Sequence, residues 1–306
     1  MRAASLNYRD WLMVEGKYNP RQPLPLIPGS DGVGVVDAIG EGVERFQVGD
    51  RVLPTFAQGW TDGPPEKTTL RATLGGPLDG VLGEQMVIDA EGAVAAPAYL
   101  SDIEAATLPC AAVTAWNALV VHGELQAGER VVVQGTGGVA IFALQMATAM
   151  GAEVIALTSR DERRDRLREL GAVEVINYRE DPEWGRTVRK QFGGAQLVVD
   201  VGGAATLPQS LAAMTIGGRI CQVGNLGGGR VEVDLISLFM QQVRLQGILV
   251  GHRASFEAMN RFLETHQLRP LVDRTLPLEQ TADALTQLAA GEQFGKICIR
   301  ISESSS

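Results

Sequence analysis

One stretch indicates the fold class of this chain most clearly: Val131-Val-Val-Gln-Gly-Thr-Gly-Gly-Val-Ala140, which continues into Ile141-Phe-Ala-Leu-Gln-Met-Ala-Thr-Ala-Met-Gly151. The β-branched residues predict a buried strand, the glycines a tight turn, and the alanine-rich run a helix that begins at once. A helix that directly follows a glycine turn presents free backbone N–H groups and the positive end of its dipole. Such an arrangement binds the pyrophosphate of a dinucleotide.

The spacing of the glycines supports this interpretation. Gly135-x-Gly137-x-x-Ala140 fits the G-x-G-x-x-G/A pattern of dinucleotide-binding turns. A further strand, predicted at Glu153–Leu157, follows the helix, as a βαβ unit requires. Glycine-rich turns also join strands to helices without binding a ligand, so the prediction depends on the elements around the turn. The residues predicted to hold the pyrophosphate are Gly135, Thr136, Gly137, Gly138 and Val139.

The composition excludes several classes of protein. The 306 residues are 45% hydrophobic and 21% charged, and the net charge of −9 provides no basic face for nucleic acid. A run of about 18 apolar residues, which a membrane span needs, is absent from the sequence. The N-terminal residues show no secretory pattern, and Cys110, Cys221 and Cys298 are dispersed among apolar neighbours. We therefore expect a cytoplasmic protein without nucleic-acid or membrane partners.

Two kinds of organisation follow one another along the chain. Residues 1–110 are rich in turns and strands, with strands predicted at Gly32–Ile39 and Arg51–Leu53 and a long loop at 59–83. From Ala115 onward, strands and helices alternate. The predicted strands are Arg130–Gln134, Glu153–Leu157, Val173–Ile176, Gln196–Val201, Arg219–Val223 and Arg244–Val250, with helices at Val139–Met150, Asp161–Leu170, Pro182–Gln191 and Ala204–Met214.

Strands joined by helical crossovers predict a doubly wound parallel sheet, so the fold class is α/β. The last segment carries predicted helices at Ala254–Thr265 and Ala282–Ala290 and a strand at Lys296–Ile301, which we expect to return to the first domain. The predicted division is therefore a β-rich domain at 1–114, a cofactor-binding domain at 115–253 and a returning segment at 254–306. The tail Ser302–Ser306 is predicted to be disordered.

Four segments together resemble the medium-chain dehydrogenase/reductase superfamily. They are Pro25-Leu-Ile-Pro-Gly-Ser-Asp-Gly-Val-Gly-Val-Val-Asp-Ala-Ile-Gly-Glu-Gly-Val43, Phe46-Gln-Val-Gly-Asp-Arg-Val52, Leu108-Pro-Cys-Ala-Ala-Val-Thr-Ala-Trp116 and Phe294-Gly-Lys-Ile-Cys-Ile299. The resemblance covers nearly the whole chain. It implies a GroES-like catalytic domain beside a Rossmann domain, an active site in the cleft between them, and hydride transfer with NAD(P)(H).

The resemblance also implies the absence of zinc. Zinc alcohol dehydrogenases of this superfamily carry a Cys where Asn7 stands and a His where Ser30 stands. Cys110 matches a third ligand position, but one thiolate cannot hold a catalytic zinc ion, which needs three protein ligands. The cysteine-rich structural zinc lobe is missing from residues 59–83. The chain thus looks like the zinc-free, quinone oxidoreductase-like branch, and we expect no metal site.

A second departure from the family lies at the beginning of the sequence. Family members normally carry about two further β-strands before the segment that begins here at Met1. The resemblance therefore places Met1 in mid-strand, and a missing strand would expose the edge of a sheet. A missing strand would affect the stability and activity of the first domain but not the cofactor site.

The end of the second predicted strand bears on the choice of cofactor. An acidic residue that binds the ribose of NAD should lie there, but the chain reads Leu157-Thr-Ser-Arg160 and offers no carboxylate before Asp161. Thr158, Ser159 and Arg160 could instead hold a 2′-phosphate, which predicts NADP(H), with NAD(H) and a solvated arginine as the alternative. Tyr178 matches a family position beside the adenosine ribose or phosphate, and its alternative is a surface aromatic residue.

Other residues are predicted to approach the cofactor. Gly202, Gly203 and Gly224 follow the fourth and fifth strands, where a dinucleotide crosses the sheet edge. Leu249, Val250 and Gly251 are predicted to line the nicotinamide pocket, and Thr114 matches a family position near the nicotinamide. Lys296 is predicted to approach the cofactor, with a solvated lysine as the alternative. His122, His252 and His266 lack metal-ligand spacing and are predicted to cap helices or lie on the surface.

Two residues are candidates for the chemistry. Asn7 matches a position in the family's catalytic cleft and could hydrogen-bond a substrate carbonyl in place of zinc, whereas the alternative is an amide that stabilises a turn. Tyr18 falls where related enoyl reductases carry a proton-donating tyrosine, and the alternative is an aromatic lid.

The sequence leaves three functions open. The leading hypothesis is a zinc-independent, NADPH-dependent reductase of quinones or α,β-unsaturated carbonyls. The alternatives are an alcohol dehydrogenase of unknown substrate and a nucleotide-binding protein without efficient catalysis. The apolar strand Val243–Val250 lies at one end of the predicted sheet, and in the family this edge commonly pairs with its symmetry mate, which predicts a homodimer.

Overall fold

A computed structural model describes residues 1–302, so most of the tail predicted to be disordered, residues 303–306, lies outside the described part. The chain forms two compact units. Unit 1 comprises Met1–Val113 together with the segment from Val250 onward, and unit 2 comprises Thr114–Leu249.

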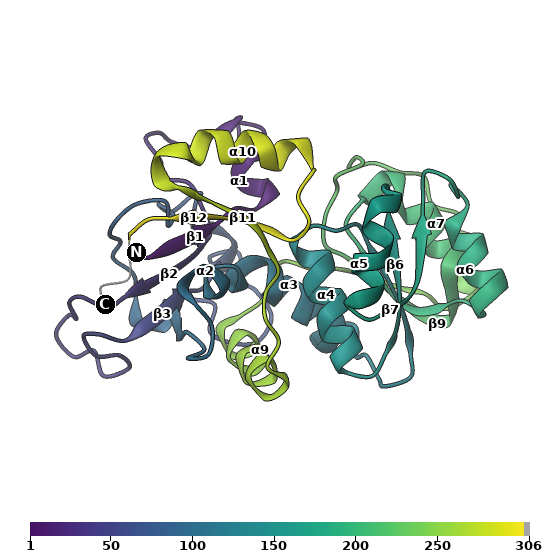
Figure 1. Ribbon diagram of the computed structural model, residues 1–306, viewed down its shortest axis with the longest axis horizontal. Coiled ribbons are helices and arrows are strands. Elements are labelled where there is room, and N and C mark those ends of the chain that lie inside the picture. Colours follow the sequence, from purple (N-terminus) through teal and green to yellow (C-terminus); the bar gives the residue numbers. More distant parts are fainter. Residues whose placement is uncertain (303–306) are drawn as a thin grey trace. The chain divides into compact units, whose positions relative to one another are not determined.

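Unit 2 is a doubly wound α/β domain (Figure 1). Its six strands are all parallel and run in the order β10-β9-β8-β5-β6-β7. The strands are β5 (Arg130–Gln134), β6 (Glu153–Thr158), β7 (Ala172–Asn177), β8 (Ala195–Asp200), β9 (Met214–Gln222) and β10 (Arg244–Gly247). The chain winds from β5 to one side and then from β8 to the other, so the carboxyl ends of β5 and β8 flank the topological switch point, where such sheets bind dinucleotides.

The sequence explains why β5 is central. Val131, Val132 and Val133 are at most 1% exposed, and residues buried on both faces of a parallel sheet form continuous apolar runs. The crossovers are α4 (Gly138–Ala149), α5 (Arg164–Glu169), α6 (Trp184–Phe192), α7 (Leu207–Ala213) and α8 (Leu235–Met240). The predicted fold class is thereby confirmed for this unit.

Two predicted elements of unit 2 have clearly different bounds in the structure, and one helix was not predicted. The sixth strand ends at Gly247, and Val250 has a φ of 42°, a left-handed conformation outside the β region. The helix predicted at Ala204–Met214 is shorter, because a 3₁₀ turn precedes it and Met214 already begins β9. Helix α8 was not predicted.

Unit 1 contains the second sheet, in the order β11-β12-β1-β2-β3-β4. The strands are β1 (Ala3–Ser5), β2 (Asp31–Val35), β3 (Arg51–Pro54), β4 (Ala93–Ala95), β11 (Val272–Pro277) and β12 (Lys296–Arg300). The helices are α1 (Tyr8–Val14), α2 (Asp102–Ala105), α9 (Arg253–His266) and α10 (Thr281–Ala290), and α1 packs beside α10 (Figure 1). Strands β1 and β12 pair in antiparallel fashion, so the first and last strands of the chain are neighbours in one sheet.

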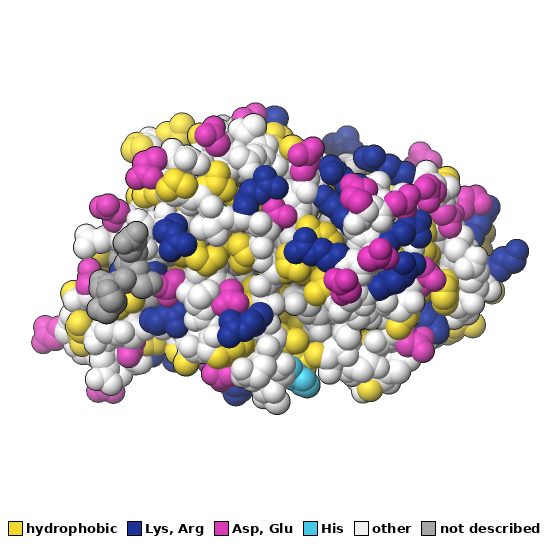
Figure 2. Space-filling view, in the orientation of Figure 1, with side chains coloured by type: hydrophobic (Ala, Val, Ile, Leu, Met, Phe, Trp, Pro, Cys, Tyr) yellow, Lys and Arg dark blue, Asp and Glu magenta, His cyan; other side chains and the backbone are white. Residues whose placement is uncertain are grey.

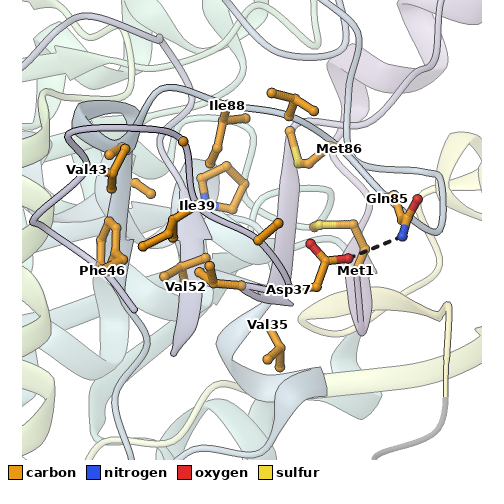
Figure 3. A pocket seen from close by; sticks show the side chains of 18 residues that line it. Met1, Val35, Asp37, Ile39, Val43, Phe46, Val52, Gln85, Met86 and Ile88 are labelled. Atoms are coloured by element: carbon orange, nitrogen blue, oxygen red, sulfur yellow. Dashed lines mark hydrogen bonds between the residues drawn. The ribbon is translucent and has the colours of Figure 1, made fainter. Parts of the chain in front are cut away.

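The exposed sheet edge expected near the start of the chain is not β1, because β1 pairs with both β12 and β2. A groove of about 400 Å³ lies between the residues that continue β2 and the segment 85–90 (Figure 3). Most of its lining is apolar, and Ile39, Val52 and Met86 face the cavity. At one end, Nε2 of Gln85 donates a hydrogen bond to Oδ2 of Asp37 at 3.2 Å. No residue predicted to bind cofactor or act in catalysis lines this groove.

Among residues 1–302, no helix is both long and apolar enough to cross a bilayer.

Candidate functional site

The glycine turn of unit 2 has the geometry of a phosphate-binding loop. Gly135 has a φ of 83° and donates its N–H to the carbonyl of Leu157 at 2.8 Å, which turns the chain tightly at the end of β5. Gly137 is the N-cap of α4, so Gly138 and Val139 stand in the first turn, whose N–H groups have no partner within a helix. A Cβ added at Gly135 or Gly137 would meet no atom within 4 Å, so the space over the turn is open to a ligand.

A buried carboxylate, which no sequence pattern indicates, holds the neighbouring loop. Asp200, the last residue of β8, is 0% exposed and accepts hydrogen bonds on both oxygens. The backbone N–H groups of Gly202 and Gly203 each donate to Oδ1 at 3.0 Å. The side chains that also donate to the carboxylate are Gln134, Thr206, Ser210 and Gln222. Asp200 therefore ties the ends of β5, β8 and β9 to the turn that carries the two predicted glycines.

Backbone crowding explains why glycine occupies this edge. A Cβ at Gly203, whose φ is 70°, would lie 2.6 Å from the carbonyl oxygen of Gly228. A Cβ at Gly224 would lie 2.8 Å from the carbonyl oxygen of Val201. Both distances are shorter than any real Cβ contact, so only glycine fits at these positions.

The residues predicted to select the cofactor gather at the ends of β6 and β7. Thr158 is 1% exposed, and its hydroxyl accepts the N–H of Arg160 at 3.2 Å. Tyr178, which is 40% exposed, donates its N–H to the carbonyl of Thr158 at 3.0 Å. Ser159 lies between Thr158 and Arg160 in the chain. The guanidinium of Arg160 is 3.9 Å from Glu162, and charged side chains of both signs are interspersed over α5 (Figure 2).

Arg163 is a further cation at this end of the sheet that the sequence analysis missed. Its guanidinium donates to the hydroxyl of Thr136, inside the glycine turn. An arginine that follows β6 thus reaches the phosphate-binding loop, although 27 residues separate the two in the sequence. The sequence does not distinguish Arg163 from the other arginines, which account for most of the cations of this chain.

The other residues predicted to contact the nicotinamide fall in both units. Thr114 is 5% exposed and belongs to a short helix, α3 (Val113–Trp116), flanked by π-helical turns, a conformation frequent at functional sites. Leu249 is the last residue of unit 2, whereas Val250 and Gly251 begin the second segment of unit 1. Their contact with a cofactor stays a prediction.

Unit 1 contains a cluster of buried polar side chains around Asn7. Asn7 is the N-cap of α1, and its side-chain amide donates from Nδ2 to the hydroxyl of Ser30 at 3.4 Å. The ammonium of Lys296 lies 2.6 Å from Oδ1 of Asn7 and 3.3 Å from Oδ2 of Asp31. Lys296 is 3% exposed, so it is not a solvated lysine, and its approach to the cofactor stays a prediction.

Two carboxylates complete the cluster. Asp31 is 0% exposed, and burial raises its pKa to about 6 although the ammonium of Lys296 acts in the opposite direction. Asp10 is also fully buried and accepts the backbone N–H of Asn7 at 2.8 Å, while burial raises the pKa of its carboxyl. The backbone and side chain of Asn7 are therefore both fixed by ionisable groups.

Two positions of this cluster that match zinc ligands in the family carry other donor types. Asn7 and Ser30 offer an amide and a hydroxyl that are hydrogen-bonded to each other, whereas structural and catalytic zinc sites use thiolates, imidazoles and carboxylates. Burial raises the pKa of the Cys110 thiol well above its ordinary value. Within residues 1–302, no group of three or more His, Cys, Asp or Glu side chains could hold a metal ion.

Tyr18 lies on the same unit as Asn7. Its side chain is 47% exposed, and the guanidinium of Arg9 lies over its ring, 5.0 Å from the centroid. The phenol is thus held from one side and reachable from the other. Of the histidines, His252 caps α9 by accepting the N–H of Ser255 at 3.0 Å, which confirms its predicted structural role.

Comparison with known proteins agrees with both units. Residues 138–265 match the family described as zinc-binding dehydrogenase, and residues 1–98 match the alcohol dehydrogenase GroES-like domain. A zinc-type alcohol dehydrogenase-like protein of Schizosaccharomyces pombe is 39% identical, over 98% of this chain and 89% of that protein. An acryloyl-coenzyme A reductase of Sulfurisphaera tokodaii is 27% identical, over 97% and 90%.

The solved structures agree as well. The crystal structure of a putative alcohol dehydrogenase from Sinorhizobium meliloti superposes with a TM-score of 0.91, at 44% identity over 98% of this chain and 89% of that one. Together with the strand order, the open glycine turn and the GroES-like sheet, these matches show that the chain belongs to the medium-chain dehydrogenase/reductase superfamily and is a nicotinamide-dependent oxidoreductase.

Proposed function

We propose that the protein is a zinc-independent, NADPH-dependent reductase of α,β-unsaturated carbonyls or quinones. The observation that carries this proposal is the cluster at Asn7, where an amide and a hydroxyl stand at the family's zinc-ligand positions and a lysine holds the amide in place. An amide N–H can polarise a carbonyl oxygen as charge develops on it, which is the task of the metal in zinc enzymes. The name of the acryloyl-coenzyme A reductase relative favours a C=C acceptor.

The residues have separate tasks in this proposal. The N–H groups of the turn at residues 135–139 hold the pyrophosphate, and Thr158, Ser159, Arg160 and Tyr178 surround the adenosine end. Gly202, Gly203 and Gly224 let the dinucleotide approach the sheet edge. Thr114 and residues 249–251 lie beside the nicotinamide. When bound, the reduced nicotinamide supplies the hydride. Asn7 donates to the substrate carbonyl, and Tyr18 delivers a proton to the carbon that the hydride does not attack.

The test is oxidation of NADPH and NADH by a panel of enones, an enoyl thioester, quinones and aldehydes, with metal analysis of the same preparation. We expect turnover with C=C or quinone acceptors, a preference for NADPH, and no stoichiometric zinc. Turnover restricted to aldehydes and alcohols, with zinc bound at one ion per chain, would establish an alcohol dehydrogenase, the function that the names of several relatives suggest. Binding of NADPH without turnover of any acceptor would indicate a nucleotide-binding protein.

The proposed cofactor preference depends on Arg160. Arg160→Ala should weaken NADPH binding about 10- to 100-fold and leave NADH binding nearly unchanged, because only the 2′-phosphate of NADPH can accept a charge-assisted bond. Dissociation constants from cofactor fluorescence measure this difference. Arg186→Ala is the matched control, since Arg186 is a surface arginine of the same unit that pairs with Glu183. Equal losses for both cofactors would place the guanidinium of Arg160 away from the phosphate.

We also propose a homodimer through the outer edge of β10. Every residue of this strand is exposed, it pairs only with β9, and the neighbouring helix α8 exposes Leu235, Ile236, Phe239 and Met240 by 62–67%. Leu245→Glu should convert a dimer into a monomer in light scattering at micromolar concentration, because a buried charge would face its symmetry mate. Val173→Glu, on the opposite edge strand β7, should leave the dimer intact. A monomeric unmodified protein would contradict the proposal.

A further inference from the structure

The ammonium of Lys296 uses all its donors within unit 1. Its three acceptors are the carbonyl of Leu6 at 2.8 Å, Oδ1 of Asn7 at 2.6 Å and Oδ2 of Asp31 at 3.3 Å. An ammonium group has three N–H donors and accepts nothing, so this set saturates it. The side chain begins β12 and is 3% exposed. Lys296 is thereby a fixed internal group.

This saturation determines which way the amide of Asn7 faces. Because an ammonium can only donate, the atom of Asn7 nearest to it must be the oxygen. The amide nitrogen then points the other way, toward the hydroxyl of Ser30 at 3.4 Å. The side chain of Asn7 also donates to the carboxyl of Asp31, a hydrogen bond that lowers the pKa of that group. The contact with Ser30 is long for an N–H···O bond, so a substrate carbonyl can replace the hydroxyl as the acceptor. The amide of Asn7 is partly exposed, so an acceptor can reach it.

We infer that Lys296 is a positioning residue that locks the amide of Asn7 with its N–H donor, and not its oxygen, presented to the substrate carbonyl. The inference rests on the proposed function, in which Asn7 polarises that carbonyl. A free amide can rotate by half a turn and present its oxygen, which would repel the carbonyl. Lys296 excludes that orientation, and Asp31 in turn holds the ammonium in place.

This role differs from a cofactor contact and can be separated from it. Lys296→Met removes the donor while retaining a side chain of similar length. At saturating NADPH we expect kcat for an enone to fall about 10- to 100-fold, the scale of loss for a misdirected group, with the dissociation constant of NADPH unchanged. Lys296→Gln, which can still donate to Oδ1 of Asn7, should restore part of the loss. Lys190→Met, at an exposed position on α6, is the matched control and should behave like the unmodified protein.

A double-mutant cycle tests whether Lys296 acts through Asn7. Asn7→Ala should lower kcat, and adding Lys296→Met to Asn7→Ala should lower it no further, because no amide remains to be positioned. Losses that multiply in the double variant would overturn the inference, as would a rise in the dissociation constant of NADPH with kcat unchanged. Full activity of Asn7→Ala would overturn the proposed role of Asn7 and the inference with it. A loss in Asn7→Ala without a loss in Lys296→Met would overturn the inference alone.

The folding of Lys296→Met needs a control of its own, because Lys296 also neutralises the buried carboxylate of Asp31. Lys296→Met leaves Asp31 without its cation, and an unpaired buried charge is destabilising. The double variant Lys296→Met with Asp31→Asn removes both charges and should fold with a melting temperature close to that of the unmodified protein. Its kcat should remain as low as that of Lys296→Met. Recovery of kcat together with stability would show that the first loss came from misfolding, and would overturn the inference.

Discussion

Tyr18→Phe is expected to lower kcat for an enone about 10²–10⁴-fold while the affinity for NADPH stays the same, which is the cost of losing a general acid. The substitution retains the ring, so the packing of the guanidinium of Arg9 against it at 5.0 Å is preserved and only the hydroxyl is lost. Quinone reduction should suffer much less, because the oxygens of a quinone can take protons from water. Steady-state rates with both acceptors on one preparation measure the difference.

A second substitution separates the hydroxyl from the ring. If the ring merely covers the site, Tyr18→Phe should be almost fully active and Tyr18→Leu impaired on both acceptors. If the hydroxyl is the proton donor, Phe and Leu should be similarly slow on the enone. Equal enone and quinone activity in Tyr18→Phe would remove the phenol from the chemistry and leave Asn7 with ordered water as the proton source.

Asp200→Ala is expected to destabilise the protein by about 3–5 kcal/mol, because each buried donor left without an acceptor costs about 1–3 kcal/mol and entering water offsets part of the sum. The donors left behind include the N–H groups of Gly202 and Gly203 and the hydroxyl of Ser210, which lies 2.6 Å from the carboxylate. Thermal unfolding should show a fall in Tm of about 10 °C. The affinity for NADPH should fall as well, since the turn loses its anchor.

The control for this prediction is Asp165→Ala. Asp165 is a surface carboxylate of the same unit whose side chain is 92% exposed, so its loss should change stability by no more than about 0.5 kcal/mol. Asp200→Asn keeps the shape but places an amide N–H among donors, so it should also be destabilised, although less than Asp200→Ala. An unchanged Tm in Asp200→Ala would contradict the structural role of the carboxylate.

The sequence predicts those parts of unit 2 that depend on local pattern. The valine run, the glycine turn and the alanine-rich helix are consecutive, so their period and turn chemistry define β5 and α4 to within a residue. The parallel arrangement of the strands follows from the alternation of strands and helices, because parallel neighbours need a crossover connection. Helix α8 was missed because most of its residues are apolar and exposed, which gives no amphipathic pattern.

The candidate site was predictable only in part, because its polar networks join residues far apart in the chain. The hydrogen bond from Gln134 to Asp200 spans 66 residues, and the contact of Lys296 with Asn7 spans 289. No local pattern distinguishes these side chains from solvated ones. The resemblance to a family identified Asn7 and Tyr18 as candidates, but it gave no indication that Lys296 is buried against Asn7 or that Arg163 reaches Thr136.

The pairing of β1 with β12 has a consequence for synthesis on the ribosome. The partners of Ala3, Ala4 and Ser5 are Arg300, Ile299 and Cys298, so the sheet of unit 1 cannot close until almost the entire chain has been translated. Unit 2 is formed by one continuous segment, Thr114–Leu249, which is translated before the last segment of unit 1. Contacts between such distant residues are slow to form, because the entropy of closing the loop opposes them. The Rossmann unit should therefore fold first, while Asp10 and Asp31 stay hydrated until Lys296 emerges.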